Sequence, residues 1–136
     1  GGRATPEGGT VVKARRLRLL NSEPFLLSTT VVPESSCPEF TFEGPDSLTV
    51  YELIERKYGI QVQRVKSTLE TAVLDEFEAD LLSVQHSLPA FRLERTAFTG
   101  DGQPVAFTVH LIRGDRCQFS FEVDGRIQAP AGVLSD

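Results

Sequence analysis

The chain has 136 residues, of which 40% are hydrophobic and 24% charged, with a net charge of −5 at pH 7. This length suffices for one domain with a buried core and is too short for two. The net negative charge argues against nucleic-acid binding by this chain alone, because binding to phosphates needs a basic face. No apolar run approaches the ~20 residues of a membrane span, and none near the start indicates secretion, so a cytoplasmic location is expected.

The two ends of the sequence differ from its middle. Residues 1–9 carry no apolar period and are expected to form a flexible leader. Residues 127–136 are expected to be a short tail. The segment 10–126 is then a single folded domain, without an internal repeat or a low-complexity stretch.

Six strands are predicted, because apolar residues alternate with polar ones as in strands with one buried face. Leu17 and Leu19 are expected to point into the core, and Val65, Leu69 and Val73 share one face of the third strand. The strands are expected at residues 11–20, 24–32, 62–74, 90–99, 104–113 and 117–124.

The last part of this pattern includes a hairpin. Asp101 and Gly102 supply the backbone freedom of a tight turn between the fourth and fifth strands. Phe119, Phe121 and Val123 provide the alternation on which the sixth strand rests.

Two helices interrupt the strands. The first is expected to begin near Thr49, with Glu52 at capping-box spacing, and to end at Gly59. The second is expected to begin near Asp75, with Glu78 three residues further on. Its side chains that face the core are expected to be Phe77, Leu81 and Leu82. Since strands and helices do not alternate regularly, the prediction is an α+β domain with a mainly antiparallel six-stranded sheet and two principal helices.

Cys37 and Cys117 are too few for a disulfide scaffold, and neither has the spacing or the nearby histidine of a zinc site. Reduced, packed thiols are the favoured interpretation. A disulfide, or an oxidation-sensitive Cys37 on a loop, is the alternative. No metal or cofactor is expected.

A series of short phrases, in a fixed order, gives the chain a family resemblance from about Ala14 to Val123. The phrases are Arg16-Leu17-Arg18-Leu19, Glu23-Pro24, Val32-Pro33, Thr49-Val50-Tyr51-Glu52-Leu53-Ile54, Tyr58-Gly59-Ile60, Leu93-Glu94-Arg95-Thr96, Gly102-Gln103-Pro104-Val105 and Arg113-Gly114-Asp115-Arg116. Together they resemble the UTRA domain, the effector-binding half of GntR-type bacterial repressors of the HutC subfamily. The resemblance implies a chorismate-lyase-like fold, a homodimer and a small-molecule ligand.

In that family a winged-helix DNA-binding domain precedes the effector domain. No basic helix-turn-helix pattern precedes Val11. The chain is therefore expected to be the sensor half, and to act on DNA only through a winged-helix domain that it does not contain.

Arg16 and Arg18 are two residues apart on a predicted strand, so their side chains leave the same face about 7 Å apart. Two guanidinium groups suit a phosphate or a carboxylate, since each offers a planar fork of donors. The alternative is a solvated basic edge that also includes Lys13 and Arg15. The resemblance favours the anion site, because the family's phosphate-binding arginines fall on Arg16 and Arg18.

Thr49 and Tyr51 stand at the start of the first predicted helix, where free N–H groups favour an anion. By resemblance they match a Ser-x-Tyr of the phosphate pocket in sugar-phosphate sensors. The alternative is that Thr49 only caps its own helix and Tyr51 packs. Both roles are compatible.

The remaining candidate ligand residues come from the resemblance and its departures. Ser28 and Ala106 stand where the family often has an acid, and Ile112 stands where it often has a tyrosine. These changes predict a less acidic and more apolar pocket, which favours an organic acid over an amino sugar phosphate. His110, beside Thr108, is either a hydrogen-bonding ligand contact or a satisfied structural histidine.

Three functions are compatible with these features. A sensor of a small anionic metabolite, either a sugar phosphate or an organic acid, is favoured by the paired arginines. A dimerisation module that has lost its ligand is second. A chorismate-lyase-like enzyme ranks last, because Ser28, Ala106 and Ile112 leave no general acid or base, so no catalytic residue is expected.

Overall fold

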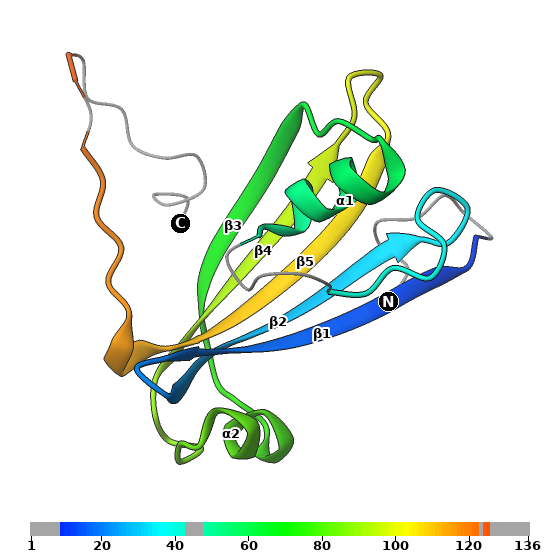
Figure 1. Cartoon of the computed structure of the whole chain (residues 1–136). Helices are drawn as coiled ribbons and strands as arrows, with labels where there is room; N and C mark the ends of the chain where they lie inside the picture. Colours follow the sequence, from blue (N-terminus) through cyan, green and yellow to red (C-terminus); the bar gives the residue numbers. More distant parts are fainter. Residues whose placement is uncertain (1–8, 43–47, 123, 126–136) are drawn as a thin grey trace.

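The computed structural model describes residues 9–42, 48–122 and 124–125. Five strands form one antiparallel sheet in the order β1-β2-β5-β4-β3 (Figure 1). The strands are β1 (Val11–Leu20), β2 (Glu23–Pro33), β3 (Arg64–Ala72), β4 (Ala90–Phe98) and β5 (Pro104–Arg113). The helices are α1 (Val50–Tyr58) and α2 (Glu76–Leu82), and a 3₁₀ turn, η1 (Gly114–Arg116), follows β5. The predicted α+β class with a mainly antiparallel sheet is confirmed.

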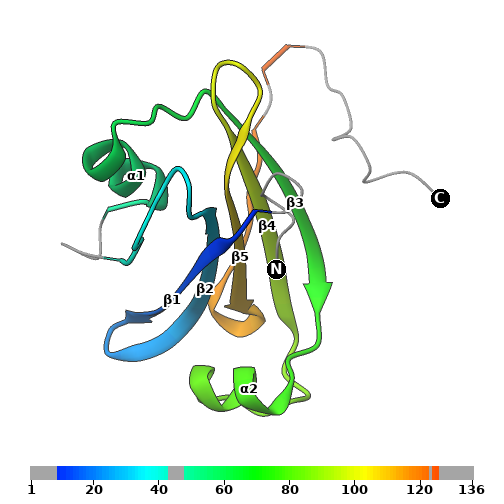
Figure 2. The same cartoon turned by 90° about the vertical axis from the view of Figure 1, so that its right-hand side faces the viewer.

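The two helices cover opposite faces of the sheet near opposite ends (Figures 1 and 2). The cluster that includes α1 consists of Val32, Cys37, Phe40, Leu48, Val50, Leu53, Ile54, Ala97, Val105 and Ala106. The cluster that includes α2 consists of Leu27, Leu74, Ala79, Leu82, Ala90 and Leu111. Val32 and Leu27 are an odd number of residues apart on β2, so they point to opposite faces. Each helix therefore completes its own small core.

Both helix starts agree with the sequence. The backbone N–H of Glu52 donates to Thr49 Oγ1 and the N–H of Thr49 donates to Glu52 Oε1, each at 3.1 Å. Asp75 and Glu78 form the same reciprocal capping box on α2. At the end of α1, Gly59 adopts a left-handed conformation with φ of 68°, which glycine tolerates without a steric penalty. The predicted hairpin is also confirmed, with Gly102 at φ of 84° between β4 and β5.

The predicted sixth strand is absent from the described residues. After η1 the chain leaves the sheet (Figure 1), and residues 117–122 join no ladder. Because β5 already pairs with β2 and β4, a further strand could pair only with β1 or β3 at the edges of the sheet. Phe119 packs edge-on against Phe91, with ring centroids 5.2 Å apart, whereas Phe121 is 80% exposed. Val123, which the prediction included, lies outside the described residues.

Three expected core residues are exposed. Leu17 and Leu19 lie on the edge strand β1, where the short helix α2 does not cover them, and Leu19 is 56% exposed. Phe77 is 55% exposed, and the guanidinium of Arg15 lies 5.2 Å from its ring centre. Val73, just past the end of β3, is also exposed. Alternation predicted the face of these side chains but not whether another element covers it.

Other expectations concern the thiols and the ends of the chain. Cys37 and Cys117 are free thiols, as favoured from the sequence. Burial raises the pKa of Cys37 to about 11, so this thiol stays protonated at neutral pH. The expected leader (apart from Gly9) and tail lie outside the described residues. Within the described part of the chain, no helix is long and apolar enough to cross a bilayer.

Ile54 is a test of the core beneath α1, since its side chain is fully buried. Ile54→Ala is expected to lower the free energy of unfolding by about 2–5 kcal/mol, through lost burial and the cavity it leaves. Urea titration followed by circular dichroism measures this change. The exposed Leu19→Ala serves as the control, expected to change stability by less than about 0.5 kcal/mol. Equal losses in both variants would contradict this assignment of the core.

Candidate functional site

A pocket of about 100 Å³ lies between one face of the sheet and the start of α1. Its lining residues are Arg16, Arg18, Ser28, Thr30, Phe42, Thr49, Val50, Tyr51, Arg95, Thr108 and His110. The strand register explains why distant segments meet there. Ser28 pairs with both Arg16 and His110, and Thr108 pairs with Arg95. Directly opposed residues in a sheet project to the same face, so β1, β2, β5 and β4 all contribute to one surface.

The two paired arginines point to the pocket face, and their neighbours do not. Arg16 donates from Nη1 to the carbonyl oxygen of Leu48 at 3.3 Å, and its guanidinium lies 4.3 Å from the centre of the Phe42 ring. Arg18 lines the same pocket. Lys13 and Arg15 have the opposite parity on β1 and are exposed. The strand therefore separates a half-buried pair of arginines from a solvated pair of basic residues.

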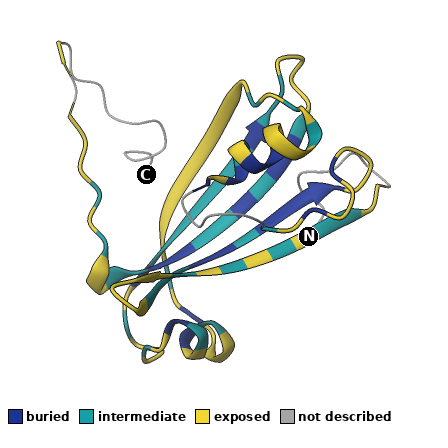
Figure 3. Ribbon diagram, in the orientation of Figure 1, coloured by how far each residue is buried: buried dark blue, intermediate teal, exposed yellow. Residues whose placement is uncertain are grey.

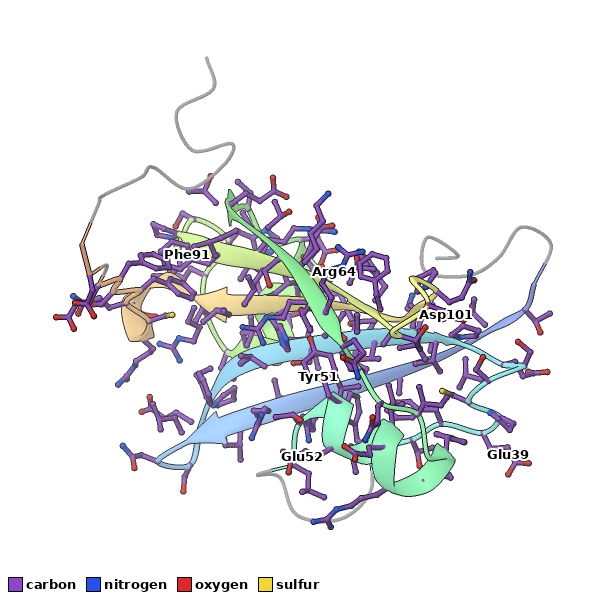
Figure 4. All side chains as sticks on the ribbon, turned by 90° about the horizontal axis from the view of Figure 1, so that it is seen from above. Glu39, Tyr51, Glu52, Arg64, Phe91 and Asp101 are labelled. Atoms are coloured by element: carbon purple, nitrogen blue, oxygen red, sulfur yellow. The ribbon has the colours of Figure 1, made fainter. Side chains whose placement is uncertain are left out.

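The roof of the pocket is the first turn of α1. Thr49 uses its hydroxyl oxygen to accept from the N–H of Glu52, so capping occupies an acceptor but leaves its O–H proton available. Tyr51 lies between the start of α1 and the strands (Figure 4). Burial raises the pKa of Tyr51, while a hydrogen bond from Arg95 and its positive charge act in the opposite direction. The phenol is therefore neutral at pH 7 and in contact with Arg95.

The floor of the pocket is polar and buried. Ser28 Oγ and His110 Nδ1 are 2.7 Å apart, and the hydroxyls of Thr30 and Thr108 are 3.0 Å apart. These groups belong to the two neighbouring strands β2 and β5. Each polar group of the floor therefore has a partner on the next strand, and the sheet backbone fixes their relative positions.

His110 is neutral at physiological pH. Burial, the largest cause, and the positive charges of Arg95, Arg16 and Arg18 together lower its pKa from 6.5 to about 4. The effect of these charges also indicates that all three guanidinium groups lie close to the imidazole.

Seven of the nine predicted site residues line this pocket, and two do not. Ala106 is buried in the cluster beneath α1, opposite Ala97. Ile112 is buried one row beyond His110, opposite Leu26 and Phe91. The apolar wall expected from these two residues is therefore not part of the pocket, whose floor is made of hydroxyls and an imidazole.

Sequence reasoning missed four lining residues: Thr30, Phe42, Val50 and Arg95. Val50 stands between the two predicted residues Thr49 and Tyr51. Thr30 lies two residues from Ser28, so alternation on one strand was enough to find it. Arg95 belongs to a quoted family phrase, but its place opposite Thr108 depends on the β4–β5 register. Phe42 comes from a connecting segment, for which no periodicity exists.

A larger and more open depression of about 580 Å³ lies beside α2. Two of its charged groups, Arg113 and Asp115, already pair with each other. Arg113 forms a two-point ion pair with Asp115 and also donates to the carbonyl of Pro24 at 3.1 Å. No group of three or more His, Cys, Asp or Glu side chains in the described residues could hold a metal ion. The smaller pocket, with its convergent arginines, is therefore the candidate ligand site.

Comparison with known proteins identifies the class. The UTRA domain model matches residues 4–118, and the chain belongs to the UTRA domain family. The crystal structure of the effector domain of PhnF from Mycobacterium smegmatis superposes with a TM-score of 0.76 at 28% identity, covering 87% of this chain and 72% of that one. The ligand-binding domain of a putative GntR-family regulator from Bordetella bronchiseptica gives a TM-score of 0.78 at 23% identity, covering 90% and 81%.

Two curated relatives are transcriptional repressors. The chain is 28% identical over 115 residues to the HTH-type transcriptional repressor NagR of Bacillus subtilis, covering 85% of this chain and 47% of that protein. It is 29% identical over 113 residues to the HTH-type transcriptional repressor PhnF of Mycolicibacterium smegmatis, covering 83% and 46%. The chain thus spans about half the length of these relatives. Their names agree with the expectation that the chain is a regulatory domain and not an enzyme.

The buried His110 predicts an acid-sensitive fold. Its pKa is about 4 in the folded state and about 6.5 when unfolded, so below pH 6.5 the unfolded chain binds more protons and stability falls until about pH 4. The loss attributable to His110 is at most about 3 kcal/mol. Urea titration between pH 7.5 and 4 measures the free energy of unfolding. In His110→Gln this free energy is expected to lack the part of its decrease that His110 causes. The exposed His86→Gln should keep it, and identical pH profiles for both variants would contradict the prediction.

Proposed function

We propose that this chain is the effector-sensing domain of a GntR-type regulator of the HutC subfamily, acting in the cytoplasm. It binds a small anionic metabolite in the pocket beneath α1. Binding modulates DNA contact by a winged-helix domain outside this chain. The observation that carries the proposal is the convergence of Arg16, Arg18 and the start of α1 on a buried polar floor. Guanidinium forks and free helix N–H groups both favour an anion.

The proposed control of DNA binding is thermodynamic. A ligand shifts the equilibrium between two arrangements of attached DNA-binding domains only by the difference in its affinity for them. The pocket suits such coupling because its floor and roof belong to different elements. The floor is formed by the central strands, whereas the roof is the start of α1. A ligand that contacts both elements favours one position of the helix relative to the sheet.

The chemistry of the lining supports an anion without an ammonium group. No carboxylate lines the pocket among the described residues. An amino sugar phosphate would place its ammonium group near guanidiniums and without an acidic partner, which is unfavourable in a buried site. The polar floor suits a ligand with hydroxyl or carbonyl oxygens. Both the phosphate of an uncharged sugar and a hydroxylated organic acid are therefore candidates.

Substitution of Arg16 tests the site. Arg16→Ala is expected to weaken binding of the effector by about 1.5–3 kcal/mol, the scale of a hydrogen bond to a charged group. The matched control is Arg15→Ala, which removes the same charge from the opposite face of β1. Calorimetric titration uses glucose 6-phosphate, glucosamine 6-phosphate and a panel of organic acids. Tight binding of the amino sugar phosphate would contradict the proposed ligand chemistry, and equal effects of the two substitutions would contradict the site.

We also propose that the domain forms a homodimer. β3 is an edge strand and is exposed along nearly its whole length (Figure 3). Val65 and Leu69 lie on its pocket-side face and are 38% and 39% exposed. An uncovered strand edge with apolar side chains favours association with a second chain. If the pocket binds no effector, dimerisation alone is the alternative role of the domain.

The dimer is tested by sedimentation. The unmodified chain is expected to sediment at twice the mass of its 15.0 kDa monomer at micromolar concentration. Leu69→Lys places a charge on the apolar face of β3 and is expected to shift the equilibrium toward monomer. Thr68→Lys, the neighbour on the opposite and exposed face, is the control because it adds the same single charge. A monomeric unmodified chain at high micromolar concentration would overturn the proposal.

A further inference from the structure

We propose that Arg95 is a third ligand-binding arginine and that the effector is a compact dianion, held by Arg16 and Arg18 on one side and by Arg95 on the other. The inference rests on the proposed function of the pocket and narrows its ligand class. β4 and β1 are separated by β2 and β5, so Arg95 lies about three strand spacings, or roughly 14 Å, from Arg16 between backbones.

The side chain of Arg95 projects to the same face as the two other arginines. Arg95 pairs with Thr108, Thr108 with Thr30, and these two threonines form the buried hydrogen bond of the floor. The positive charge of Arg95 also acts on Tyr51 in the roof, where it opposes the effect of burial on the pKa of the phenol. The same charge acts on His110 more strongly than those of Arg16 and Arg18. Arg95 therefore reaches toward the middle of the pocket from the border opposite β1.

Arg95 differs in its partners from two other arginines of the sheet, Arg92 and Arg113. Arg92, on the same strand but the opposite face, lies 3.0 Å from a carboxylate oxygen of Glu94. Arg113 is paired with Asp115 in the same way. Arg95 forms no ion pair with a described carboxylate, and its Nε is buried without a hydrogen-bond partner. A buried, unmatched donor on a cation is costly to leave unsatisfied, so the free energy favours a ligand oxygen at this position.

The number of positive charges indicates the charge of the ligand. Three guanidiniums around a cavity of about 100 Å³ create a positive potential that favours a dianion over a monoanion. His110 stays neutral there, so it adds a hydrogen-bonding group to the floor and no further charge. The small volume selects a ligand of few atoms. A dianion satisfies these conditions either as a phosphate-type group with both charges on one centre or as a short dicarboxylate with two centres.

Matched pairs of small anions test the charge requirement at pH 8. Succinate is compared with monomethyl succinate, and inorganic phosphate with dimethyl phosphate, in calorimetric titrations at constant ionic strength. The intact domain is expected to bind the dianion of at least one pair about tenfold or more tightly than its monoanion. The pair that shows the preference distinguishes a two-centre dianion from a one-centre dianion.

Substitution of Arg95 tests its role in that preference. Arg95→Gln is expected to weaken the dianion about ten- to hundredfold and to abolish the preference, since it removes a charged hydrogen bond. Arg95→Lys, which keeps the charge but loses the planar fork, should retain part of it. Arg92→Gln removes the same charge from the opposite face of β4 and should keep the preference. Thermal melting of each variant establishes that it is folded before titration.

The outcomes separate the two proposals. If monoanions bind as well as dianions, or if Arg95→Gln binds like the intact domain while Arg16→Ala does not, the inference about Arg95 is overturned and the proposed anion sensor stands. If no anion of these pairs or of the organic-acid and sugar-phosphate panel binds the intact domain, both proposals are overturned.

Discussion

The pairing of β2 with β5 is the constraint on which the site depends. These strands lie side by side in the middle of the sheet, and their register places Ser28 opposite His110 and Thr30 opposite Thr108. Because the side-chain period of a strand is two, a slip of one residue by either strand would turn that strand's two floor groups to the other face. The same slip would move Leu27 of β2 or Leu111 of β5, which now complete the core with α2, to the wrong side. The two cores therefore enforce the register that forms the polar floor.

Electrostatics then determines what the floor can receive. Arg95 and the paired arginines of β1 approach the floor from opposite borders, and the desolvated imidazole of His110 remains uncharged between them. The positive potential thus comes from groups that stay charged at any physiological pH. Above the range in which His110 titrates, the attraction for an anion is set by the fold and not by the pH of the medium.

The sequence predicted local features better than contacts between distant strands. Capping-box spacing located Thr49 and Asp75 as helix starts, and a two-residue separation was enough to pair Arg16 with Arg18. Arg95 was not identified, because its place in the pocket results from the order of strands β5 and β4, which periodicity does not encode. Ala106 and Ile112 lie outside the pocket for a similar reason. Both are on the same face of β5 as Thr108 and His110, but at register positions that the pocket does not include. The sixth strand was predicted from alternation alone, although no free neighbour of β5 was left for it.

The hydrogen bond from Arg16 to the carbonyl of Leu48 joins the sheet edge to the residue that precedes the N-cap of α1. This arginine therefore has two competing acceptors once a ligand is present: a backbone carbonyl and an oxyanion. Charge-assisted bonds are stronger than those to neutral acceptors. An anion that draws the guanidinium inward would loosen the tether of the α1 entry to β1, while contacts with the roof would hold the helix by a new connection. Occupancy of the pocket is thereby converted into a choice between two attachments of the same helix.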